Sequence, residues 1–156
     1  MEKAIFAAGC FWGVELNFSK VEGVLETRVG YTGGDVADPT YQQVCGKTTG
    51  HAEAIEIVFD PSVVSYEQLL EKLWDFHDPT TLNRQGPDVG TQYRSVIFYL
   101  NDKQKAAAEK SINETNRSGK FANPIVTEVT AASKFWPAEE YHQKYLEKKG
   151  ITIACS

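Results

Sequence analysis

The chain has 156 residues, of which 42% are hydrophobic and 24% charged, as expected of a soluble protein with one hydrophobic core. Its net charge of -5 argues against nucleic acid and anionic membranes as partners, and no apolar run has membrane-spanning length. The three cysteines are far apart and lack zinc-binding spacing, so we expect neither a metal site nor a disulfide framework. No signal-peptide pattern precedes the first strand, and we expect a single cytoplasmic domain over residues 1–156.

Short apolar runs and helical patterns alternate along the chain and define its predicted elements. In the first part of the chain we expect a strand at 3–8, a helix after Cys10, and strands at 24–31 and 51–59 with one helical turn at 40–45 between them. A helix from 65 to 77 and a strand at 95–100 follow. The last part should contain a helix from 101 or 102 to 117, a strand at 125–130 and a helix from 137. Ser65 and Gln68 form a capping box for the third of these helices. The last helix should begin at Pro137 and turn Tyr141 and Tyr145 inward.

The order of these elements predicts an α+β fold. Strand, helix, strand, strand, helix and strand make a ferredoxin-like βαββαβ core, so we expect a two-layer sandwich with additional C-terminal elements. Residues 80–92 form a polar loop without an element of its own, and its length suggests a functional role. Fold alone does not determine the chemistry.

Cys10 lies in the stretch Gly9–Gly13, where the first strand ends and the first helix begins. Unpaired N–H groups at a helix start favour negative charge, so the thiol pKa could be lowered there and the reactive thiolate formed. The alternative is an ordinary cysteine buried between aromatic residues, which is the commoner role of a free cysteine. The cysteine alone therefore favours the buried structural role.

Glu53 is an unusual residue for the core-facing side of a strand, where it alternates in phase with Ile55, Ile57 and Phe59. Burial among apolar side chains would raise its pKa and keep the carboxyl neutral. A neutral carboxylic acid near a nucleophile is a candidate general acid. The alternative is a solvated carboxylate at an exposed strand end.

Four further polar residues are candidates. Tyr41, Tyr93 and Asp88 lie in predicted loops, where tyrosine usually packs and aspartate usually forms turns. His51 shares the strand face of the candidate acid and could pair with Cys10 as in cysteine hydrolases. A purely structural hydrogen bond is the alternative for this histidine.

Seven blocks of the sequence resemble, in order, those of the peptide methionine sulfoxide reductases of the A type. They span nearly the whole chain, and their joint occurrence makes the resemblance specific. This family reduces methionine sulfoxide, free or in proteins, and the A type acts on the S epimer at sulfur. The blocks are Gly9–Gly13, Gly30–Gly34, Pro39–Cys45, Thr49–Ala54, Phe76–Pro79, Arg84–Gly86 and Asp88–Ser95.

The resemblance implies a role for each candidate residue. The Cys10 thiolate would attack the sulfoxide sulfur, and Glu53 would protonate its oxygen. A second thiol would convert the resulting sulfenic acid to a disulfide, which thioredoxin would reduce, with no metal or cofactor. Phe11 and Trp12 would form walls of a pocket for the S-methyl group. Tyr41 and Tyr93 would hold the sulfoxide oxygen, and the acidic Asp88 would help to arrange the site.

The C-terminal tail departs from the family pattern. Many relatives carry Gly-Tyr-Cys near their C-terminus, whereas here Cys155 has different flanks and only Ser156 follows it. We expect the tail after Gly150 to move and Cys155 to resolve the sulfenic acid, with Cys45 or an external thiol as alternatives. Two other functions remain open at this point: a cysteine hydrolase that uses Cys10 with the histidine, and a non-catalytic module that binds oxidised methionine.

Overall fold

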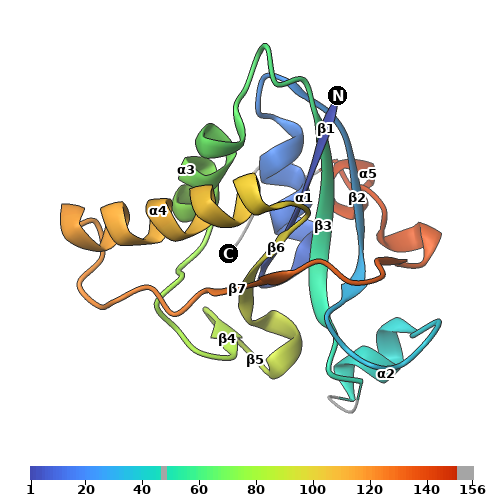
Figure 1. The fold of residues 1–156 in the computed structure, drawn as a ribbon. Helices are drawn as coiled ribbons and strands as arrows, with labels where there is room; N and C mark the ends of the chain where they lie inside the picture. Colours follow the sequence, from blue (N-terminus) through green and yellow to red (C-terminus); the bar gives the residue numbers. More distant parts are fainter. Residues whose placement is uncertain (47–48, 151–156) are drawn as a thin grey trace.

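A mixed six-stranded sheet forms the centre of the molecule in the computed structural model, which describes residues 1–46 and 49–150 (Figure 1). Its strands are β1 (Glu2–Ala8), β2 (Val24–Thr32), β3 (Ala52–Phe59), β6 (Ser95–Tyr99), β7 (Glu128–Ala131) and β8 (Trp136–Pro137). They lie in the order β7-β6-β1-β3-β2-β8. Neighbouring strands are antiparallel, except that β6 and β7 are parallel.

The predicted ferredoxin-like core is confirmed. Helix α1 (Phe11–Ser19) follows β1, and α3 (Tyr66–Phe76) follows β3, while the short α2 (Tyr41–Cys45) lies in the connection between β2 and β3. The four core strands have the order β6-β1-β3-β2, which a βαββαβ unit produces when β3 pairs with both β1 and β2. The α+β prediction therefore holds.

Helices cover one face of the sheet and give the molecule its two layers (Figure 1). On this face Phe6 and Ile57 of the strands pack with Phe18 of α1 and Leu73 of α3, all fully buried. The longer α4 (Asp102–Ser118) adds to the same cluster. Alternate strand residues form a second, smaller cluster against Phe135 on the opposite face. The period-two burial of the strands places the hydrophobic core between the sheet and the helices.

Side-chain hydrogen bonds cap the starts of α3 and α4. The Ser65 hydroxyl accepts the Gln68 N–H at 3.1 Å, and the Gln68 side chain accepts the Ser65 N–H at 2.9 Å, which confirms the predicted capping box. Asn101 caps α4 by accepting the Gln104 N–H, and Gly119 ends that helix with φ 76°.

Within the described residues, no helix is long and apolar enough to span a membrane.

The expected helix from Pro137 is wrong. Pro137 belongs to β8 and pairs with Gly30 at the edge of β2. A 3-10 turn, η2 (Glu140–His142), and a short helix, α5 (Tyr145–Lys148), follow, and Tyr141 is 58% exposed rather than buried. Proline at a helix start is a local signal, whereas pairing with β8 satisfies backbone groups at an otherwise open sheet edge.

The expectation of an unstructured loop at 80–92 is also wrong. It contains the hairpin strands β4 (Arg84–Gln85) and β5 (Asp88–Val89), and then the 3-10 turn η1 (Thr91–Tyr93). Strands of two residues leave no alternation for a sequence pattern to reveal. The hairpin nevertheless gives the candidate Asp88 a defined position.

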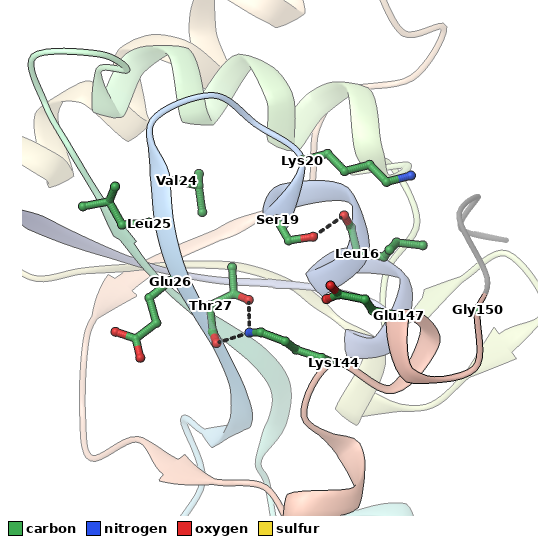
Figure 2. A pocket seen from close by; sticks show the side chains of 10 residues that line it. All are labelled: Leu16, Ser19, Lys20, Val24, Leu25, Glu26, Thr27, Lys144, Glu147 and Gly150. Atoms are coloured by element: carbon green, nitrogen blue, oxygen red, sulfur yellow. Dashed lines mark hydrogen bonds between the residues drawn. The ribbon is translucent and has the colours of Figure 1, made fainter.

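Polar contacts attach the C-terminal segment to α1 and β2, and Figure 2 shows those between Lys144 and Thr27. Glu15 is 2% exposed, and its carboxylate accepts the Thr27 hydroxyl at 2.8 Å and the Lys144 backbone N–H at 2.6 Å. The Lys144 ammonium donates to the carbonyl and the hydroxyl of Thr27, each at 3.3 Å. Lys144 and Thr27 line a cavity of about 460 Å³, which no predicted site residue lines.

Candidate active site

Cys10 lies at the turn between β1 and α1, where the sequence predicted it. It is the N-cap residue of α1, with φ -59° and ψ 120°. The preceding Gly9 has φ 96°, and a Cβ there would come within 2.6 Å of the Gln85 side chain. Only glycine both adopts this positive φ readily and leaves room for the Gln85 side chain. Gln85 is itself fixed, because its amide pairs with the N–H and C=O of Asp78 at 2.8 and 2.7 Å.

The surroundings of Cys10 correct the expectation of a lowered pKa. The pKa of Cys10 is raised to about 12, because burial disfavours the thiolate and the charges of Glu53 and Asp88 add to the effect. The N–H groups of Trp12 and Gly13 lower the pKa, but Cys10 makes no capping hydrogen bond and their effect is smaller. Burial and nearby negative charge therefore raise the pKa of Cys10 more than the helix N-terminus lowers it, and the thiol is neutral in the free site.

Glu53 is buried on β3, as its phase in the strand predicted, and is 1% exposed. Its Oε1 accepts the N–H of Phe11 at 3.3 Å, which ties the carboxyl to the start of α1. Burial and the charge of Asp88 raise the pKa of Glu53 to about 8, against the opposing effect of the Phe11 bond. Oε2 is buried without a hydrogen-bond partner in the described chain. At neutral pH this carboxyl is therefore mainly protonated, and it has an oxygen available for a ligand.

Tyr41, Tyr93 and Asp88 reach the same site from α2, η1 and β5. Burial raises the pKa of both tyrosines; the neighbouring Cys45 side chain adds to the effect on Tyr41, and the charge of Glu53 acts on both. The pKa of Tyr93 reaches about 12, so both hydroxyls are protonated donors at neutral pH. Asp88 is close enough for its charge to raise the pKa of Tyr93 as well. The structure thus brings the candidate polar residues together.

An aromatic wall lies beside Cys10. Phe11 is buried, with its ring centroid 5.7 Å from that of Tyr31 and 6.3 Å from that of Tyr41. Trp12 is half-buried and stacks on Tyr145, with 3.9 Å between ring centroids and 8° between ring planes. Phe11 and Trp12 follow Cys10 directly at the start of α1, and both rings belong to an aromatic cluster that includes Tyr41.

Two residues that support this wall were missed by the sequence interpretation. The Glu139 carboxylate accepts the Tyr31 hydroxyl at 2.8 Å and the Tyr41 backbone N–H at 3.0 Å. His142 Nδ1 accepts the Trp12 indole N–H at 2.9 Å. These bonds join positions 98 to 130 residues apart, so no local pattern could reveal them. Both residues lie in the stretch that helical periodicity misassigned.

His51 has a structural role. Its Nδ1 accepts the Gly34 N–H at 3.0 Å, so the ring proton lies on Nε2, which donates to the Val36 carbonyl at 2.7 Å. Both ring nitrogens are occupied by the loop after β2, and His51 is 2% exposed. It therefore has no nitrogen available to deprotonate Cys10, which argues against a cysteine hydrolase.

Cys10 and Cys45 are both free thiols. Cys45 ends α2, and its pKa is raised by burial and by the charge of Glu53, against the opposing effect of the neighbouring Tyr41 hydroxyl. Cys155, the predicted resolving residue, lies outside the described residues. Within the described chain, Cys45 is the second thiol near the site.

Known proteins resemble this chain over nearly its whole length. The peptide methionine sulfoxide reductase MsrA of Methanosarcina acetivorans is 62% identical over 97% of this chain and 80% of its own. The solved structure of reduced Mxr1 from Saccharomyces cerevisiae is 36% identical, covers 99% of this chain and 88% of its own, and gives a TM-score of 0.91. A complex of Mxr1 with Trx2 is 23% identical over 92% and 84% of the two chains, with a TM-score of 0.63, and shares the fold.

The family comparison covers the same extent. The family model described as peptide methionine sulfoxide reductase matches residues 2–155, which include every candidate site residue. The match therefore covers far more than the stretch around Cys10. Together with the identity to the archaeal relative, it shows that the chain belongs to the peptide methionine sulfoxide reductase family.

Proposed function

We propose that this chain reduces the S epimer of methionine sulfoxide, free or in proteins, with Cys10 as nucleophile and Glu53 as acid. The state of Glu53 carries the proposal: it is 1% exposed, its pKa is about 8, and its Oε2 has no partner in the described chain. A sulfoxide oxygen accepts hydrogen bonds strongly. A neutral acid is the group that can donate to this oxygen and then protonate it.

The proposed step transfers the sulfoxide oxygen to the cysteine. The Cys10 sulfur bonds to the sulfoxide sulfur while Glu53 gives its proton to the oxygen, and the proton of the thiol restores the acid. In the resulting intermediate the hydroxyl group moves from the substrate sulfur to the Cys10 sulfur, so that the substrate sulfur–oxygen bond and the bond between the two sulfurs both break. Methionine leaves, and Cys10 holds the oxygen as a sulfenic acid. The two-electron reduction of the sulfoxide balances the two-electron oxidation of the cysteine.

The raised pKa of Cys10 fits a thiol that becomes reactive only when substrate is bound. A sulfoxide hydrogen-bonded to Glu53 carries partial positive charge on its sulfur, which favours the thiolate beside it. The N–H groups of Trp12 and Gly13 lower the pKa further. In the free enzyme the neutral thiol reacts slowly with other oxidants, because the thiolate is the nucleophilic form.

The remaining site residues orient the substrate. The Tyr41 and Tyr93 hydroxyls are protonated donors that can hold the sulfoxide oxygen together with Glu53. Asp88 raises the pKa of the acid and so keeps its proton in place. Phe11 and Trp12 provide the apolar wall for the S-methyl group, and a chiral sulfur with oxygen on one side and methyl on the other then fits in one configuration.

Separated epimers test this proposal. Methionine released from the S and R sulfoxides is measured by chromatography with dithiothreitol as reductant. We expect turnover of the S epimer and at most background conversion of the R epimer. Equal rates would contradict the proposed oxygen and methyl sites, and tight binding without turnover would indicate a binding module instead.

We further propose that Cys155 resolves the sulfenic acid on Cys10 and that thioredoxin reduces the disulfide, in a single cytoplasmic domain over 1–156. Thiol–disulfide exchange is the chemistry by which thioredoxin acts, and Mxr1 is known in complex with Trx2. The family match extends over 2–155.

Cys155→Ser should release one methionine per enzyme and then stall with thioredoxin, because the sulfenic acid has no partner for a disulfide. A small thiol should partly restore cycling. Steady-state and single-turnover rates are compared, with Cys45→Ser as the matched control that should cycle normally. Normal cycling of Cys155→Ser with thioredoxin would instead assign resolution to Cys45 or to the external thiol.

A further inference from the structure

The geometry points to His142 as a positioning residue that holds the Trp12 indole in place and thereby sets the size of the alkyl group accepted at the substrate sulfur. This inference rests on the proposed function, in which Trp12 is a wall of the S-methyl pocket. It assigns the selectivity of that wall to a residue far from it in sequence.

The hydrogen bond between the two side chains is the first observation. The Trp12 indole N–H donates to His142 Nδ1 at 2.9 Å. An indole N–H only donates, so Nδ1 must be the unprotonated nitrogen of the imidazole. Burial lowers the pKa of His142, which keeps the ring neutral and Nδ1 an acceptor at neutral pH. The bond therefore persists at neutral pH.

The second observation is the cost of this arrangement. His142 is 1% exposed, and its Nε2, which carries the proton, is buried without a partner in the described chain. A buried polar atom without a hydrogen bond destabilises the fold, so an apolar side chain of similar size would suit the position better for packing alone. Acceptance of the Trp12 N–H is the contact that an apolar residue could not make.

The rings around His142 show what this contact restrains. The imidazole centroid is 5.2 Å from the centroid of Phe11, 5.6 Å from that of Trp12 and 4.4 Å from that of Tyr41. Trp12 also stacks on Tyr145. The indole is thus held by stacking on one ring and by a directional bond to another, and it cannot swing away from Cys10 without losing both.

His142 is itself held firmly. Its backbone N–H donates to the Glu139 carbonyl at 2.9 Å within the turn η2, and the Glu139 carboxylate bonds to β2 and α2 through Tyr31 and Tyr41. On the other side, the Gln143 amide pairs with both the N–H and the C=O of Val29, each at 2.9 Å. The residues on both sides of His142 are therefore anchored to the sheet, and the acceptor has a fixed position.

The expected consequence is a change in alkyl selectivity. One additional methylene in a well-formed hydrophobic pocket changes kcat/KM by about 10–200-fold. When the indole is free to move, the pocket should admit an S-ethyl group more readily and hold an S-methyl group less well. The ratio of kcat/KM for methionine sulfoxide to that for ethionine sulfoxide should then fall by about tenfold.

Two amide variants provide a matched test. In His142→Asn the amide oxygen can occupy the position of Nδ1 and accept the indole N–H. In the longer His142→Gln the amide oxygen occupies the position of Nε2, and this position does not face the indole. We expect His142→Asn to retain most of the methyl preference and His142→Gln to lose it. In the Trp12→Phe background, which has no indole N–H, the two amides should give the same ratio. An unchanged ratio in His142→Gln, or equal losses in both single variants, would overturn the inference.

A second measurement covers the case in which His142→Gln does not fold. The indole N–H resonance of Trp12, assigned by its absence in Trp12→Phe, should show slow hydrogen exchange in the wild type and in His142→Asn. Rapid exchange in the folded wild type would overturn the inference. Wild-type turnover of methionine S-sulfoxide is measured first, since its absence would contradict the proposed function rather than the role of His142.

Discussion

Cys10→Ser should abolish methionine formation from the S-sulfoxide, leaving only the rate found without enzyme. A serine hydroxyl has no accessible oxidation state that could take up the oxygen, so the loss does not depend on which thiol resolves the cycle. Methionine release is measured by chromatography in a single turnover and in steady state. Cys45→Ser is the control and should release a full equivalent of methionine, since this thiol has no part in the oxygen transfer.

Retained single turnover in Cys10→Ser would remove Cys10 from the chemistry. Thermal unfolding of the variant distinguishes loss of function from loss of fold. We expect a similar melting temperature, because serine fits the N-cap position at least as well as cysteine does.

Glu53→Gln should slow the first turnover by about 10²–10⁴-fold, the usual contribution of a general acid, while keeping some activity. The amide can still donate a hydrogen bond to the sulfoxide oxygen but cannot deliver a proton. Glu53→Ala should be slower still, because it supplies neither. The rate of methionine release in a single turnover measures both, and wild-type rates in the two variants would contradict the acid role.

The pH dependence provides an independent check on Glu53. Its pKa is about 8 in the folded protein, against 4.5 ordinarily, so the wild-type rate should fall as pH rises through 8. The folded state holds this proton more tightly than the unfolded state, so the proton stabilises the fold below pH 4.5 and that stabilisation is lost between 4.5 and 8. Glu53→Gln has no such loss.

Urea unfolding at acidic and alkaline pH measures this effect on stability. Relative to the wild type, Glu53→Gln should gain free energy of unfolding as the pH rises, while its activity is lower throughout. A constant difference between the two proteins across this range would show that Glu53 titrates normally.

Part of this molecule follows from local sequence patterns. The alternation of Glu53 with apolar residues predicted its burial, the capping box at Ser65 predicted a helix start, and the element order predicted the sheet. The burial pattern, the capping box and the type of each element depend on neighbours within a few residues, and the order of the elements follows from them. The same reasoning placed Cys10 at the turn between β1 and α1.

The rest depends on contacts between distant segments. The helix start predicted a lowered pKa at Cys10, but the carboxyl groups of Glu53 and Asp88 lie on β3 and β5, far from Cys10 in sequence, and burial is set by the whole fold. Proline is common at helix starts, which predicted a helix from Pro137, but this residue instead pairs with the edge strand β2 as part of β8. His142 reaches Trp12 across 130 positions, and no periodicity could indicate such a pair.

Trapping of the oxidised cysteine tests oxygen transfer to Cys10 most directly. The Cys45→Ser/Cys155→Ser double variant, which cannot form an internal disulfide with Cys10, is given one equivalent of methionine S-sulfoxide without reductant and treated with a sulfenic-acid-specific diketone. We predict one trapped adduct on the peptide that contains Cys10 for each methionine released. Methionine release without an adduct on Cys10 would contradict the mechanism.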